Sequence, residues 1–240
     1  MRVTLNGIVA SDDDREIYEW FGYRAFSPEQ IRDAIAKNPV GEDLVLEINS
    51  PGGSVFAGSE IYSILRGCSI PTRAEIQSLA ASAASYLCLG CDQVAISPVA
   101  QMMMHLPSTT TSGDRTEHQR SIGMLDATRE AILNAYELKA QGKTERAELR
   151  RMMSSETWLS AQDALDHGLV DEILGQEDGM PSPGPSSLVN AFGLPDITAL
   201  RAAYVRANPE ETPQNTPTAP EHTPKDWRLS ARLKMEQNRF

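Results

Sequence analysis

The chain has 240 residues, a formal net charge of −11 and 40% hydrophobic residues. This length suffices for one sizeable α/β domain with a hydrophobic core, and leaves additional chain beyond it. The acidic net charge argues against non-specific binding of nucleic acid. The sequence contains no run of about 18 apolar residues, the length that a membrane-spanning helix requires. We therefore expect neither nucleic acid nor a membrane as a partner.

The amino-terminal segment and the cysteines both favour the cytoplasm. The first residues, MRVTLNGIVASDDD, lack the basic and apolar pattern of a secretory leader. Cys68, Cys88 and Cys91 are too few to predict a disulfide framework. Cys88 and Cys91 form a lone C-x-x-C without a second pair or a nearby histidine, which favours buried apolar side chains over a metal or redox site. We expect no metal and no cofactor.

The first half of the chain alternates predicted strands and helices. Ser27 caps a helix that has Pro28 at its first position and ends near residue 38. Residues 11–14 are expected to form an acidic turn after the first strand. The rhythm predicts a largely parallel sheet with helices packed against it. The strands are expected at 2–10, 44–48 and 72–76, and the later helices at 57–65 and 83–89.

The second half begins with two short strands, at 94–96 and 102–104, the second of which ends at His105. A flexible turn at 107–113 precedes a long helix over 114–140. We expect further helices at 145–153 and 161–167 and a last strand at 169–174. The apolar positions of the long helix recur at spacings of three and four: Met124, Leu125, Thr128, Ile132, Ala135 and Leu138.

Two segments and one histidine suggest nucleophilic catalysis. Small residues crowd around Ser82 in the segment AASAAS, which leaves space for an acyl carbon and an oxyanion beside a serine hydroxyl. Upstream, Gly52 and Gly53 form a turn whose backbone N–H groups are free to approach a substrate. His105 leaves a strand end downstream. Each feature is weak alone, but together they favour a serine nucleophile.

Four motifs carry a family resemblance: INSPGGSVFAGSEIYSIL, SLAASAASYL, MMMHLP and ETWLSAQDALDHGLVDEI. In this order they resemble the Clp protease proteolytic subunit, and more closely the head-maturation proteases of tailed phages and prophages. The resemblance covers residues 3–174. It implies a ClpP/crotonase-like spiral of βαβ units within an α/β fold. It also implies a protruding handle helix that packs on another subunit's handle, and a ring-shaped homo-oligomer.

The resemblance also assigns the site. Ser82 corresponds to the nucleophile, His105 to the base and Glu156 to the acid, while Gly53 and Ala83 correspond to the oxyanion hole. Unfoldase-partnered members usually carry Asp at the acid position, and the spacing from Ser82 to His105 is slightly shorter here. A longer carboxylate can still orient an imidazole. Both departures favour the phage branch.

Other residues compete for these roles. Ser54 and Ser85 are rival nucleophiles by position, and Asp171 and Asp114 are the next candidates for the acid. The remaining histidines are expected in surface or capping roles: His118, His167 and His222.

Composition changes at residue 175. Of the 15 prolines, 9 fall between Pro181 and Pro224, and such a segment buries too little apolar surface to fold. We therefore divide the chain into a protease domain at 1–174 and a largely disordered tail at 175–240. Short helices are expected in the tail after Pro195 and within 226–240.

The sequence thus predicts an ATP-independent serine endopeptidase that cleaves scaffold, capsid or portal precursor proteins in head maturation, in the host cytoplasm and the phage prohead. One alternative is a proteolytic subunit that works with a Clp-type ATPase. Another is a non-catalytic scaffold with a protease fold. A crotonase-like acyl-CoA enzyme would place a second glycine-rich turn where this chain has SLAAS, and it would leave Ser82 and His105 unexplained.

Overall fold

The computed structural model describes residues 1–175 and 196–207. Residues 1–200 form one compact unit and residues 201–240 a second. Helix α8 (Ile197–Ala207) confirms the helix expected after Pro195. The helical candidate at 226–240 lies outside the described residues. No helix of the described part has the length and apolar content that crossing a membrane requires.

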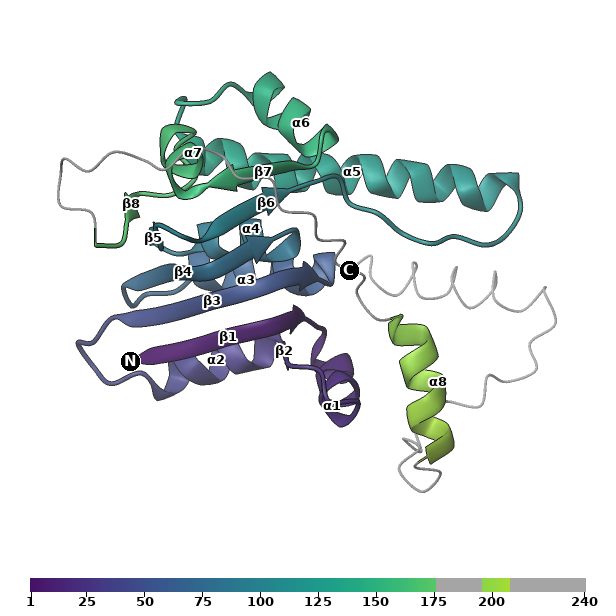
Figure 1. Cartoon of the computed structure of the whole chain (residues 1–240). Coiled ribbons are helices and arrows are strands. Elements are labelled where there is room, and N and C mark those ends of the chain that lie inside the picture. Colours follow the sequence, from purple (N-terminus) through teal and green to yellow (C-terminus); the bar gives the residue numbers. More distant parts are fainter. Residues whose placement is uncertain (176–195, 208–240) are drawn as a thin grey trace, which may run out of the picture. The chain divides into compact units, whose positions relative to one another are not determined.

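The elements of residues 1–175 alternate along the chain (Figure 1). The strands are β1 (Arg2–Val9), β2 (Ala25–Phe26), β3 (Leu44–Gly53), β4 (Thr72–Ala81), β5 (Gln93–Ile96), β6 (Gln101–Met104), β7 (Thr157–Ser160) and β8 (Glu172–Ile173). The helices are α1 (Asp12–Trp20), α2 (Pro28–Lys37), α3 (Val55–Arg66), α4 (Ala83–Leu87), α5 (Arg115–Ala140), α6 (Arg146–Ser154) and α7 (Ala161–Asp166), with a 3-10 turn at Cys88–Gly90.

The strands form one sheet in the order β2-β1-β3-β4-β5-β8. All neighbours in this order run parallel, as the βαβ rhythm predicts. β4 is long enough to pair with β5 along its first half and with β6 along its second half. β7 then pairs antiparallel with β6. The α/β fold expected from the sequence is therefore confirmed.

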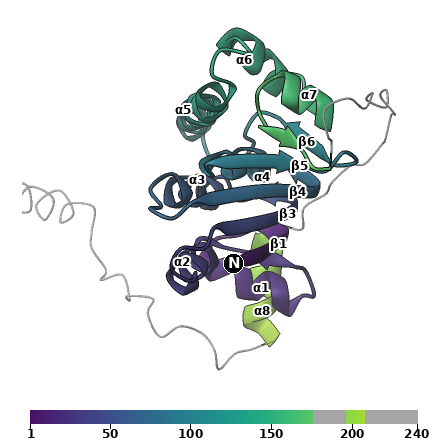
Figure 2. The ribbon, with the colours of Figure 1, turned by 90° about the vertical axis from the view of Figure 1, so that its left-hand side faces the viewer.

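Helices α2, α3 and α4 cover one face of the sheet (Figure 2). The strand residues that point toward them are fully buried, for example Leu46 and Ile76, and so are the helix residues Ile31, Ile61 and Leu87. Fully burying such a side chain contributes about 1.5–3 kcal/mol. The core therefore lies between this sheet face and the three helices, and it continues into buried residues of α5, α6 and α7.

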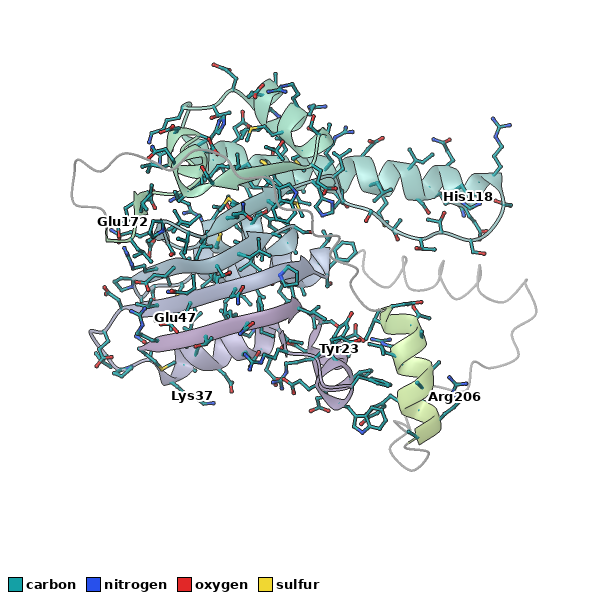
Figure 3. All side chains as sticks on the ribbon, in the orientation of Figure 1. Tyr23, Lys37, Glu47, His118, Glu172 and Arg206 are labelled. Atoms are coloured by element: carbon teal, nitrogen blue, oxygen red, sulfur yellow. The ribbon has the colours of Figure 1, made fainter. Side chains whose placement is uncertain are left out.

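The alternate residues of the same strands form a row of ion pairs across the other face. Arg2 bridges Glu47 and Glu75, and Arg73 bridges Glu75 and Glu172. Figure 3 labels Glu47 and Glu172, which lie at different strands of this row. The sheet thus has one apolar face and one charged face, which fixes the strand register because a slip by one residue would exchange them.

Helix α5 projects from the domain along its first half (Figure 1). Its buried residues all lie in its last third, and His118, near its start, marks the projecting end in Figure 3. This confirms the handle helix. The expected apolar face was partly wrong, because Leu138 is 68% exposed whereas Leu133 and Tyr136 are buried. Within residues 1–175 the helix buries side chains only in its carboxyl-terminal part, so a single buried face does not run along its whole length.

Three further expectations need correction. The acidic turn at 11–14 is wrong, because Asp12–Asp14 form the first turn of α1, where acidic side chains interact favourably with the helix dipole. Strand β3 does not stop at residue 48 but continues through the glycine turn to Gly53. No strand is predicted between the helices expected at 145–153 and 161–167, but the segment TWLS forms strand β7 there.

Candidate active site

Ser82 lies at the sharp junction between β4 and α4. Its backbone has φ 53° and ψ −123°, which side-chain-bearing residues rarely adopt. Such a conformation costs about 1–3 kcal/mol and persists only where the surroundings impose it. The Ser82 N–H donates to the carbonyl oxygen of Met103 at 2.9 Å. The flanking alanines are almost fully buried, which explains why the segment tolerates only small side chains.

His105 reaches Ser82 because β6 runs parallel beside β4. Ala81 pairs with Met103 in this ladder, so both strands end at the same edge. His105 Nε2 lies 2.7 Å from Ser82 Oγ. Burial lowers the pKa of the His105 imidazole, and the charge of Glu156 partly opposes this effect. The ring is therefore neutral at pH 7 and able to accept a proton.

Glu156 precedes β7, whose Thr157 pairs with Met104, so Glu156 is carried toward His105. It has φ 48° and an exposed side chain. Within residues 1–175 no hydrogen bond joins Glu156 to His105, and the contact between them is electrostatic. The structure thus brings Ser82 and His105 into direct contact and places Glu156 within electrostatic range.

The glycine turn packs directly on the nucleophile. Gly52 has φ +94°, and a Cβ there would lie 2.7 Å from the Cβ of Ser82 and 2.9 Å from the backbone nitrogen of Ala83. Gly53 has φ +151°, and its Cβ would lie 2.2 Å from the carbonyl oxygen of Val9. Only glycine fits at either position. The turn therefore packs its backbone at Gly52 directly against Ser82 and Ala83.

Comparison with known proteins shows the family of this chain. The family model described as Clp protease matches residues 34–177. The chain belongs to the Clp protease family. Among its relatives is the ATP-dependent Clp protease proteolytic subunit 1 of Chlamydia muridarum, 33% identical over 138 residues, which are 56% of this chain and 71% of that protein. The subunit 2 of Thermobifida fusca is 32% identical over 163 residues, 62% of this chain and 79% of that protein. Clp protease family members are serine peptidases, and so is this chain.

The rival residues of this Clp protease family chain have other partners. Ser54 caps helix α3 by accepting the N–H of Ala57. Asp171 accepts the N–H of Val94 and pairs with Lys139. Asp114 caps α5 by accepting two backbone N–H groups. Within residues 1–175 no hydrogen bond or ion pair joins any of the three to His105. Glu156 is the carboxylate whose charge acts on the imidazole.

Two tyrosines next to the nucleophile were missed by sequence reasoning. The hydroxyl of Tyr86 donates to the carbonyl oxygen of Val55, next to the glycine turn, at 2.7 Å. Tyr136 Oη lies 2.6 Å from Ser85 Oγ. Burial raises the pKa of Tyr86 to about 12, so its hydroxyl stays protonated. Tyr86 lies within the motif SLAASAASYL but received no role there, and Tyr136 lies in none of the four motifs.

The cysteines and the other histidines lie apart from this chemistry. Cys88 and Cys91 are free and buried, and burial raises the pKa of the Cys88 thiol to about 12. His118 bonds Thr111 on the surface, and His167 bonds Thr144 after helix α7. No cluster of three or more metal-ligating side chains occurs in the described ranges.

Proposed function

We propose that Ser82, His105 and Glu156 form a catalytic triad, with the N–H groups of Gly53 and Ala83 as the oxyanion hole. The observation that carries this proposal is the 2.7 Å contact between Ser82 Oγ and His105 Nε2 at the ends of two parallel strands. The positive φ of Ser82 also supports the proposal, because residues with a strained backbone are often found at active sites.

The proposed reaction is hydrolysis of a peptide bond through an acyl-enzyme. His105 Nε2 takes the hydroxyl proton of Ser82, and Ser82 Oγ attacks the peptide carbonyl. The two N–H groups stabilise the negative oxygen that develops. His105 then gives its proton to the leaving amine, and a water molecule releases the acyl group by the same route. Glu156 stabilises the imidazolium through its charge.

Hydrolysis of fluorogenic peptides by the full chain tests the triad. We expect Ser82→Ala and His105→Gln to lower kcat by several orders of magnitude, about 10³-fold or more. Ser63→Ala and His118→Gln remove the same side-chain types far from the site and should keep activity within a factor of about two. A Ser82→Ala variant with near-normal turnover would overturn the assignment.

We further propose that the natural substrates are scaffold, capsid or portal precursor proteins in phage or prophage head maturation, cleaved without an ATPase in the host cytoplasm and prohead. Support comes from the four motifs that resemble phage head-maturation proteases. Glu156 adds support, because unfoldase-partnered members usually carry Asp at that position. The exposed residues Ile122 and Met124 on the projecting part of α5 support packing against a second copy and a ring-shaped homo-oligomer.

A second candidate is a proteolytic subunit that works with a Clp-type ATPase. The relatives favour it, since their names describe them as ATP-dependent. Incubating the purified chain with capsid and scaffold precursors, with and without a Clp-type ATPase and ATP, separates the two. Cleavage without nucleotide supports head maturation, whereas cleavage only in the presence of the ATPase and ATP supports the second candidate.

A further inference from the structure

A buried hydroxyl pair lies directly behind the nucleophile. Ser85 Oγ lies 2.6 Å from the carbonyl oxygen of Ser82 and 2.6 Å from Tyr136 Oη. Ser85 is 0% exposed and Tyr136 is 1% exposed. Tyr136 comes from α5, which is remote in sequence from α4, so this contact joins two separate elements at the active site.

The direction of both hydrogen bonds follows from the number of hydrogens. The Ser82 carbonyl oxygen is only an acceptor, so the single hydrogen of Ser85 Oγ points to it. Ser85 Oγ must then accept from Tyr136, whose O–H is the donor. Burial raises the pKa of Tyr136, so this phenol is protonated at neutral pH. The pair therefore has one defined arrangement.

The carbonyl that Ser85 holds shares a peptide unit with the candidate oxyanion donor. The Ser82 C=O and the Ala83 N–H belong to one planar trans amide, in which the two bonds point in opposite directions. The Ser82 oxygen accepts from the Ser85 hydroxyl at 2.6 Å and from the Ser85 N–H at 3.0 Å. Fixing the oxygen on one side fixes the direction of the N–H on the other, and the hydroxyl supplies the shorter of the two bonds. Ala83 is also the first residue of α4, so its N–H has no partner within the helix.

We propose that Ser85 and Tyr136 are positioning residues that aim the Ala83 N–H at the oxyanion and hold Ser82 in its strained backbone conformation. This inference rests on the proposed function, because it gives Ala83 the role of oxyanion donor. Neither residue touches the substrate. Their effect acts through the peptide unit between Ser82 and Ala83, so it concerns the transition state and not substrate affinity.

Serine often bonds a carbonyl one turn back in a helix without any functional meaning. Two features set Ser85 apart. Its acceptor is the one residue of α4 or its cap with a positive φ, and its hydroxyl is held by a second buried side chain from another helix. A serine serving only the helix would need neither.

The experiment measures kcat, KM and unfolding temperature for Ser85→Ala, Tyr136→Phe and the double variant in the full chain. Thr144→Val is the matched control, because Thr144 is also a buried hydroxyl, bonded to the carbonyl oxygen of His167, far from Ser82. A full oxyanion donor is worth about 10²–10³-fold in kcat, so we expect about 10–30-fold from Ser85→Ala through loss of aim. Tyr136→Phe should lower kcat less, by about 3–10-fold. In both single variants KM should change less than twofold.

The double variant separates positioning from stability. Ser85→Ala leaves the Tyr136 hydroxyl buried without a partner, which destabilises the fold, whereas removing both hydroxyls relieves that penalty. We expect the double variant to unfold at a higher temperature than Ser85→Ala. Its kcat should be as low as that of Ser85→Ala, because both residues act through the same chain of hydrogen bonds. The rate of labelling by a fluorophosphonate, which also develops charge on an oxyanion, should fall by the same factor as kcat.

The proposal is overturned if kcat of Ser85→Ala matches that of Thr144→Val, or if kcat recovers in the double variant together with stability. A loss that appears in KM alone would also overturn it. A Ser82→Ala chain that still hydrolyses peptides would instead overturn the proposed function, whatever the behaviour of Ser85 and Tyr136.

Discussion

Replacing Gly52 by alanine tests how closely the glycine turn is fitted to the nucleophile. Two penalties add at this position. The backbone has φ +94°, which costs a residue with a Cβ about 1–2 kcal/mol. The new Cβ would also lie 2.7 Å from the Cβ of Ser82, whereas ordinary contact begins at 3.4 Å. Relieving this overlap moves Ser82 and the turn apart by about 0.7 Å.

A displacement of that size at the reacting centre costs on the order of 10²-fold in rate. Gly41→Ala is the matched control, because Gly41 has φ +82° and its Cβ would meet nothing within 4 Å. Thermal unfolding should show the loss from backbone strain in both variants, and a further loss from the steric overlap in Gly52→Ala alone. Only Gly52→Ala should lose peptide hydrolysis by about 10²-fold. Equal activity of the two variants would refute the close fit between the turn and Ser82.

Three further outcomes follow from the same structure. Because burial lowers the pKa of His105 below 6.5, the acid limb of the pH profile of kcat/KM should have its midpoint below pH 6.5. Glu156→Gln should move this midpoint to lower pH, because it removes the charge that raises the pKa of His105. A midpoint that does not move would show that Glu156 does not act on His105. Asp171→Ala should lower the free energy of unfolding by about 1–3 kcal/mol, because the Val94 N–H and Lys139 lose their acceptor, and leave kcat within about twofold; a catalytic loss would restore Asp171 as the acid. A chain that ends at Leu174 should fold, assemble and hydrolyse peptides like the full chain. When it is coexpressed with capsid and scaffold proteins, it should be packaged poorly. Aggregation of this shortened chain would show that the tail belongs to the fold.

Local signals in the sequence were sufficient for most elements. The Ser27-Pro28 start of α2 and the buried alternation of β3 were predicted because capping and side-chain period act within a few residues. The acidic residues 12–14 were misjudged because the same side chains favour a turn and the first turn of a helix. Strand β7 was missed because its pairing with β6 is non-local, and four residues carry too little pattern of their own.

The site was predictable only where a motif carried it. Ser82 and His105 were identified from their motifs, but their 2.7 Å contact depends on the parallel pairing of β4 and β6. The bond between Ser85 and Tyr136 joins residues far apart in sequence, and no local period indicates it. Glu156 was identified by resemblance alone, while its position just before β7 and its lack of a hydrogen bond to His105 within residues 1–175 emerged only from the structure.

The most direct test of the central claim is to label the full chain with a fluorophosphonate, digest it, and locate the modified residue by mass spectrometry. The Ser82–His105 contact predicts a single adduct on Ser82, and no labelling of the Ser82→Ala variant. An adduct on Ser54 or Ser85, or labelling that persists in Ser82→Ala, would contradict the assignment of Ser82 as the nucleophile.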